Sequence, residues 1–152
     1  PPQDMAAEQS VLGSMLISKD AIADVTETIR GVDFYRPAHE TIYDAVLDLY
    51  GRGEPVDMVT VAAELQRRGE LQRIGGAPYL HTLSANVPIA ANAGYYAEIV
   101  REKAILRRLV DAGTKIVQIA TPARARSTTS STRRRPRSTR SPTSARRRTT
   151  RR

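Results

Sequence analysis

Apolar residues recur at helical spacing through most of the first 120 residues. Asp4 is placed to cap a first helix, because its side chain can accept from the free N–H groups of the first turn. The apolar stripe of that helix consists of Ala7, Val11, Leu12, Met15 and Leu16. Asp20 is the predicted cap of a second helix, which ends near Gly31. Its inward residues are Ile22, Val25 and Ile29.

A third helix is predicted after Phe34, the only phenylalanine, which we expect to fill the core behind the preceding turn. Pro37 suits the first turn of this helix, where a missing N–H costs nothing, and Gly51 and Gly53 end it. Its buried face consists of Ile42, Ala45, Val46 and Leu49.

Two further short helices are predicted before Pro88. Asp57 or Thr60 caps the first of them, and Gly69 ends it. The second lies around residues 78–85, and Pro88 breaks the chain behind it. The inward residues of the two helices are Val61, Leu65, Leu80 and Leu83.

Residues 92–120 are predicted to form one long helix, because no Pro or Gly cluster interrupts the apolar spacing that Tyr95 and Ile99 begin. At 1.5 Å per residue this helix spans about 43 Å, more than a small head needs. In its second half apolar residues spread round much of the circumference. A helix of this kind expects neighbours on more than one side, yet nothing apolar follows Thr121. These residues are Ala104, Ile105, Leu106, Leu109, Val110, Ala112, Ile116, Val117 and Ile119.

No segment alternates with a period of two for long enough to predict a strand. The expected fold is all-α: a small multi-helix bundle of about six helices over residues 1–103, which ends in the long helix. Residues 104–120 form the rest of that helix, and residues 121–152 form a separate tail.

Charge divides the chain at the same place. Residues 1–120 contain 12 Lys and Arg against 16 Asp and Glu, a net charge of −4, whereas residues 121–152 contain 12 Arg and no acid. The basic character of the protein therefore comes from the tail alone. No apolar run approaches the roughly 20 residues of a membrane span, and no signal segment opens the chain, so we expect a cytoplasmic protein without a membrane partner.

Residues 1–120 contain no pattern typical of an enzyme site. There is no phosphate-binding glycine loop, and without cysteine there is neither a thiol nucleophile nor a cysteine zinc site. His39 and His81 have no partner at metal-ligand spacing, so packing or surface roles are expected for both. We expect no catalytic residue, bound metal or cofactor in this chain.

Five short stretches occur in order along the chain. They are AEQSVLG with Met15-Leu16, DFYRPAH with IYDA, PVD before VTV, GGAPYL with Leu83, and Asn92 with YYAEIV and Arg107-Arg108-Leu109. Together they resemble the N-terminal domain of the bacterial replicative DNA helicase, the DnaB family. The stretches cover about 115 residues within 4–120, and each is weak alone.

The resemblance implies a helical head followed by a helical hairpin. Hairpins pair between subunits of this family, and the paired domains form a collar on a hexameric ring where primase docks, and in some bacteria a helicase loader. ATP and Mg²⁺ bind in a separate ATPase domain of the family, which this sequence does not contain, so we expect no ATP hydrolysis or DNA unwinding from this chain alone. Residues 104–120 would be the first hairpin arm, with Ile105, Leu106, Leu109, Val110, Ile116 and Val117 as candidate subunit-interface residues.

The tail uses only Thr, Pro, Ala, Arg and Ser. Taken directly, it is a disordered basic segment that cannot build a core and would bind nucleic acid electrostatically. The candidate nucleic-acid contacts are Arg133, Arg134, Arg135, Arg146, Arg147 and Arg148.

A frameshift is the interpretation that we favour for the tail. In a GC-rich gene read one base late, the old third base, C or G, becomes the middle base, and this gives the restricted alphabet. The first base of each tail codon is then the middle base of the lost codon. By this rule Ser stands for a lost apolar residue, and Thr stands for a polar residue or Tyr. Pro stands for an Ala-like residue and Ala for a Gly-like residue, while Arg is ambiguous. Ser127, Ser130, Ser131, Ser138 and Ser141 then mark one face of a helix. We therefore expect that a frameshift near residue 120 replaced the second hairpin arm.

Three functions follow from the sequence. The leading one is an interaction module of a replicative helicase, which self-associates and contacts primase. The second is nucleic-acid binding through the tail. The third, ATP-dependent helicase activity, requires an ATPase domain outside this sequence. With half of each hairpin missing, we expect a monomer or an aggregation-prone oligomer rather than a stable hexamer.

Overall fold

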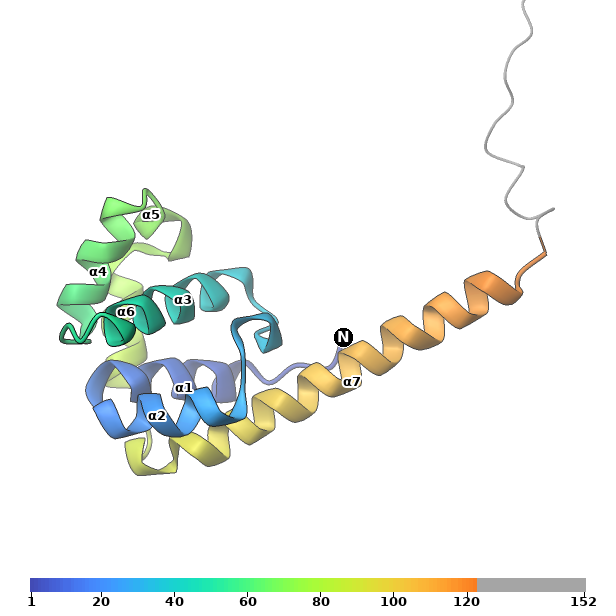
Figure 1. Cartoon of the computed structure of the whole chain (residues 1–152), viewed down its shortest axis with the longest axis horizontal. Coiled ribbons are helices and arrows are strands. Elements are labelled where there is room, and N and C mark those ends of the chain that lie inside the picture. Colours follow the sequence, from blue (N-terminus) through green and yellow to red (C-terminus); the bar gives the residue numbers. More distant parts are fainter. Residues whose placement is uncertain (123–152) are drawn as a thin grey trace, which may run out of the picture. The chain divides into compact units, whose positions relative to one another are not determined.

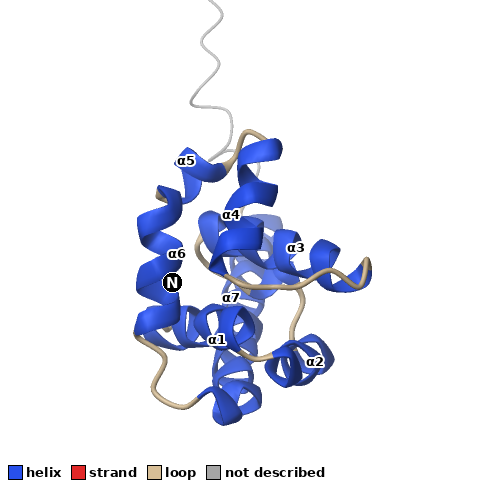
Figure 2. Cartoon of the chain, turned by 90° about the vertical axis from the view of Figure 1, so that its left-hand side faces the viewer, coloured by secondary structure: helices blue, strands red, loops and turns tan. Residues whose placement is uncertain are grey.

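A computed structural model of the chain describes residues 1–122, and every element in that range is helical (Figures 1 and 2). The expectations for residues 123–152, including the six arginines and the five decoded serines, lie outside the described residues. Within the described range there are seven α-helices and two short 3-10 helices. Their bounds are α1 Met5–Ile17, α2 Lys19–Thr28, η1 Gly31–Asp33, α3 Pro37–Gly51, α4 Met58–Arg67, α5 Leu71–Ile74, α6 Gly76–Ala85, η2 Ala90–Asn92 and α7 Ala93–Ala120.

Several predicted helix ends are confirmed by their caps. Asp4 accepts the N–H of Ala7 at 2.9 Å and starts α1. Asp57 starts α4, where its Oδ1 accepts the N–H groups of Val59 and Thr60, each at 2.8 Å. Thr60 accepts the N–H of Asp57 in return, so both predicted cap residues take part.

The predicted ends of α2 were wrong. Ser18, not Asp20, is the N-cap, because its hydroxyl accepts the N–H of Ala21 and Asp20 already lies in the first turn. At the other end the helix stops at Thr28, with Ile29 as an extended cap residue. Gly31 therefore does not end α2 but opens the 3-10 turn η1.

α1 is the central helix of the head. It contacts α2, α3 and α6, as the end-on view shows (Figure 2). All five residues of its predicted stripe are buried, and so are the inward residues predicted for α2, α3, α4 and α6. Gly13 allows the close approach of α6, because a Cβ atom there would lie 2.1 Å from the carbonyl oxygen of Leu83. Gly75, with φ of 112°, occupies the left-handed turn between α5 and α6.

α7 joins the core through small residues. Its buried residues are Ala93, Ala97, Val100 and Ala104, whereas Tyr95 is 71% exposed and Ile99 36% exposed. The sequence pattern that begins with Tyr95 and Ile99 therefore does not mark the side of α7 that meets the head.

The chain divides into two compact units, Pro1–Ile116 and Val117 onwards. In the first unit, α7 continues past the other helices as far as Ile116 (Figure 1). No helix in residues 1–122 is long and apolar enough to cross a lipid bilayer.

Candidate interaction surfaces

The second half of α7 presents a broad apolar face to solvent. All six predicted interface residues are exposed, at 40% for Ile105, 62% for Leu109 and 66% for Ile116, for example. At 100° per residue, the apolar, alanine and glycine positions from 105 to 120 fall within about half of the circumference. The apolar residues therefore form one continuous face, rather than the several sides that the sequence suggested.

The head contacts the opposite side of α7. On the same wheel, Ala97, Val100 and Ala104 are centred roughly 180° away from the middle of the apolar face. The polar residues Arg107 and Arg108 lie beside them. The apolar face of residues 105–116 thus points away from the side by which α7 is attached.

Two arginines on the attached side of α7 bind the segment before α3. Arg107 donates to the carbonyl oxygens of Asp33, at 2.6 Å, and of Pro2, at 2.8 Å. Its guanidinium also lies over the ring of Tyr35, 5.4 Å from the ring centre. Arg108 binds the Asp33 carboxylate at 3.0 Å, and the other carboxylate oxygen of Asp33 accepts the N–H of Arg30. Sequence analysis noted these arginines only as part of a resemblance.

A buried polar cluster, Glu8, His39 and Tyr79, joins α1, α3 and α6. His39 Nδ1 lies 2.8 Å from Glu8 Oε1, and His39 Nε2 lies 2.5 Å from the Tyr79 hydroxyl. Glu8 Oε2 also accepts the N–H of Tyr35 at 2.9 Å. When Nδ1 of His39 donates its N–H to the Glu8 carboxylate, Nε2 of the neutral ring accepts a hydrogen bond from the Tyr79 hydroxyl. Every polar group is paired, which is the condition for burying such a cluster.

His39 thus has a packing role, as expected, while His81 is exposed. The importance of Glu8 was missed. A signal for it exists in the sequence, because Glu8 precedes Leu12 by four residues and Met15 by seven and so shares their buried face. Within residues 1–122, no group of three or more His, Cys, Asp or Glu side chains is placed to hold a metal ion.

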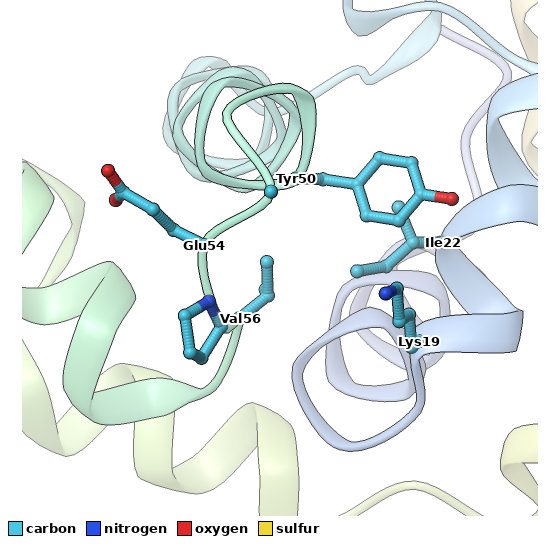
Figure 3. A pocket seen from close by; sticks show the side chains of 7 residues that line it. Lys19, Ile22, Tyr50, Glu54 and Val56 are labelled. Carbon is cyan, nitrogen blue, oxygen red and sulfur yellow. The ribbon is translucent and has the colours of Figure 1, made fainter.

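Two hollows of the head differ in the polarity of their linings. The hollow in Figure 3, about 320 Å³, is lined by Lys19, Ile22, Tyr50, Glu54 and Val56, with Gly53 and Pro55. Its one cation and one acid come from different elements and lie on different sides of it (Figure 3). A second hollow, about 470 Å³ between α4 and α6, is lined by Met58, Val59, Ala62, Ala77, Pro78 and His81 and is almost wholly apolar.

Charged side chains gather on the outer side of α4. The hydrogen bond from Arg67, followed by that from Arg68 and the charge of Arg52, lowers the pKa of Glu64 to about 2. Arg68 also binds Asp48 of α3, which ties the two helices together. In the core, burial raises the pKa of Tyr43 to about 12, and its hydroxyl donates to the carbonyl oxygen of Ile29 at 2.9 Å.

Comparison with known proteins identifies one family. The family model of the DnaB-like helicase N terminal domain matches residues 1–102. The chain is 77% identical over 118 residues to the replicative DNA helicase DnaB of Mycobacterium leprae, a match covering 78% of this chain and 20% of the relative. It is 64% identical over 123 residues to that of Leifsonia xyli, covering 81% of this chain and 27% of the relative. The chain thus spans about a fifth to a quarter of these relatives.

Solved structures also resemble the fold, and two of them are compared with it here. The N-terminal domain of DnaB helicase from Mycobacterium tuberculosis matches with a TM-score of 0.77 and 77% identity, over 78% of this chain and 86% of that one. The N-terminal domain of DnaB helicase from Helicobacter pylori, a structure described together with its interactions with primase, matches with a TM-score of 0.66 and 22% identity. It covers 76% of this chain and 89% of that one, and at this identity it shows the fold alone.

Proposed function

Because the chain belongs to the DnaB-like helicase N-terminal domain family, we propose that it serves DNA replication as an interaction module, which self-associates through α7 and contacts primase. The observation that carries this proposal is the exposed apolar half of α7, opposite the side attached to the head. Large exposed apolar patches are typical of protein interfaces. The ATPase activity of the whole helicases is not part of the proposal.

Self-association is tested with Leu109→Glu. Leu109 is 62% exposed at the middle of the apolar face, so a carboxylate there leaves the head intact and must be desolvated in any contact through this face. We expect the full chain to be monomeric when dilute and to associate weakly as its concentration rises, as measured by sedimentation velocity. Leu109→Glu should weaken this association at least tenfold. Ile89→Glu, at a residue 55% exposed and outside α7, is the matched control and should behave as the parent chain.

A parent chain that stays monomeric at every concentration would contradict this part of the proposal. Equal association of the Leu109→Glu and Ile89→Glu variants would contradict it too. A stable hexamer by light scattering would also count against it, because α7 alone supplies only one surface of the expected hairpin.

Primase contact is supported by the family and by the fold that this chain shares with the H. pylori domain. It is tested by calorimetric titration of primase into the full chain, and in parallel into Leu109→Glu. Binding to both variants would place the primase surface outside the α7 face, and binding to the parent alone would make self-association a requirement. Absence of heat and of co-sedimentation with the parent chain would refute the contact. A helicase loader is a further partner to test in the same format.

Nucleic-acid binding is the second candidate function, because residues 121–152 contain 12 Arg and no acid. Contacts of this kind release counterions, so binding weakens steeply with salt and shows little sequence preference. Fluorescence anisotropy with a labelled single strand should then give salt-dependent binding for the full chain, and none after deletion of residues 121–152. Equal binding without the tail would contradict it.

A further inference from the structure

The exposed apolar face of α7 is followed directly in the sequence by the tail, which contains only a restricted set of residue types. Exposure reaches 62% at Leu109, 66% at Ile116 and 81% at Ile119, so the apolar face is uncovered up to the last turn before the tail. The apolar positions run from Ile105 to Ile119, which corresponds to about 21 Å of helix. A helical segment that covers this face must therefore be about 15 residues long.

The residue types of the tail all belong to one class of codons. Its residues are Thr, Pro, Ala, Arg and Ser, each with a codon that has C or G in the middle. Every residue type coded only with A or T in the middle is missing from all 32 positions: Phe, Leu, Ile, Met, Val, Tyr, His, Gln, Asn, Lys, Asp and Glu. Selection for a basic tail explains the missing acids but not the missing Lys and Gln. A GC-rich message read one base late explains both.

The decoded tail contains a stripe of the required length. In this decoding, Ser codons of the TCN type mark lost codons with T in the middle, which encode apolar residues. On a helix, the positions of Ser127, Ser130, Ser131, Ser138 and Ser141 fall within an arc of about 100°. The sixth serine, Ser144, falls about 40° outside this arc. From 127 to 141 the stripe is 15 residues long, as is the face from 105 to 119.

We infer that residues 121–152 are the out-of-frame translation of a segment whose original frame encodes an amphipathic helix that covers the exposed face of α7. Thr121, Pro122 and Ala123 decode to a polar residue or Tyr, an Ala-like and a Gly-like residue. Ala125 also decodes to a Gly-like residue, so the segment between the two stripes has the composition of a turn. The matching lengths and the intervening turn fit an antiparallel return along α7. The inference and the proposed function rest on the same exposed face of α7, which is free to associate because its cover is absent.

The nucleotide sequence of the gene tests the reading frame. We expect the frame that begins one base earlier to stay open from near codon 120 through codon 152, with Val, Leu, Ile, Met or Phe at four or more of the five stripe positions. The third frame is the internal control and should lack this spacing. A stop codon in the earlier frame, or polar residues at two or more of the five positions, would overturn the inference.

A protein with the restored frame tests the cover. Compared with the present chain, we expect higher helical content by circular dichroism and at least threefold less fluorescence of a dye that binds exposed apolar surface. In the restored chain, Leu109→Glu should bring the dye fluorescence back, whereas Ile89→Glu should not. Equal dye binding by the restored and present chains would overturn the claim that the decoded helix covers α7, even if primase binding is retained.

Discussion

Glu8 shows how one side chain can join three helices. It lies on α1, receives the ring of His39 from α3 and, through that ring, the hydroxyl of Tyr79 from α6. It also accepts backbone N–H groups of the loop before α3, from Tyr35 at 2.9 Å and Arg36 at 3.4 Å. Since Glu8 is 1% exposed, water cannot replace a lost partner.

Replacement of Glu8 by Gln should therefore destabilise the head. The amide offers N–H where the loop and the histidine require an acceptor, and an unsatisfied buried group costs about 1–3 kcal/mol. We expect urea denaturation to show a loss of about 2 kcal/mol in the free energy of unfolding. Glu98→Gln, at an exposed residue of α7, is the control and should be neutral. Equal effects of the two changes would refute the role of the buried cluster.

Glu64 gives the head a defined acid sensitivity. Its arginine neighbours hold the pKa at about 2 in the folded chain, against an ordinary value of 4.5. A depressed folded pKa stabilises the fold above the unfolded pKa, and this contribution disappears as the pH falls from about 4.5 through about 2. Stability measured across that window should fall less steeply for Glu64→Gln than for the parent. Parallel curves would contradict the assignment.

At the scale of elements, the helices whose ends were predicted well are those with a local cap. Asp4 and Asp57 act on N–H groups two or three residues away, so the sequence contains the whole interaction. α2 was misassigned because Ser18 and Asp20 are both good cap residues, and only the turn after α1 decides between them. Capping signals of this kind locate a helix better than its first residue.

The packing of α1 against α6 depends on a missing side chain. A Cβ at Gly13 would lie 2.1 Å from Leu83 O and 2.4 Å from a methyl group of Val87, so the backbones must separate to admit it. Gly13→Ala should lower the free energy of unfolding by about 1–3 kcal/mol, the usual cost of overpacking. Gly51→Ala, also helical but with nothing within 4 Å of the new Cβ, should be neutral or stabilising. Equal values in thermal denaturation would contradict this account.

The site was less predictable than the fold. The family resemblance and the apolar character of α7 pointed to the six interface candidates, whose role stays a prediction. Apolar spacing predicted the buried stripes of the head. It did not show that Ala97 and Ala104, rather than Tyr95, face the head. Alanine contributes little to an apolar pattern, and its burial depends on a neighbouring surface that the local sequence does not encode. The Glu8 cluster was missed because its three members lie 31 and 40 residues apart.

For the whole molecule, the arrangement of α7 separates folding from association. Arg107 and Arg108 hold one side of the helix to the Asp33 loop, while Leu109 and Val110 lie on the side that is free. Arg107→Ala should therefore lower the unfolding free energy of the head, and Leu109→Glu should change only the association constant. In the double variant each effect should equal that of the single variant within about 0.5 kcal/mol, because the two sites share no partner. A larger coupling energy would show that the two sides communicate.

The two opposed sides of α7 also have a consequence for how this domain tolerates change. A partner on the free side of α7 does not compete with the head for the same atoms. The residues of that side can therefore vary without lowering the stability of the head. Conversely, the head keeps its α7 contacts whether or not the free side is occupied, since those contacts are complete within residues 1–108. A domain built this way can fold before its partner is made, and a coding error beyond α7 leaves a folded but unpartnered module.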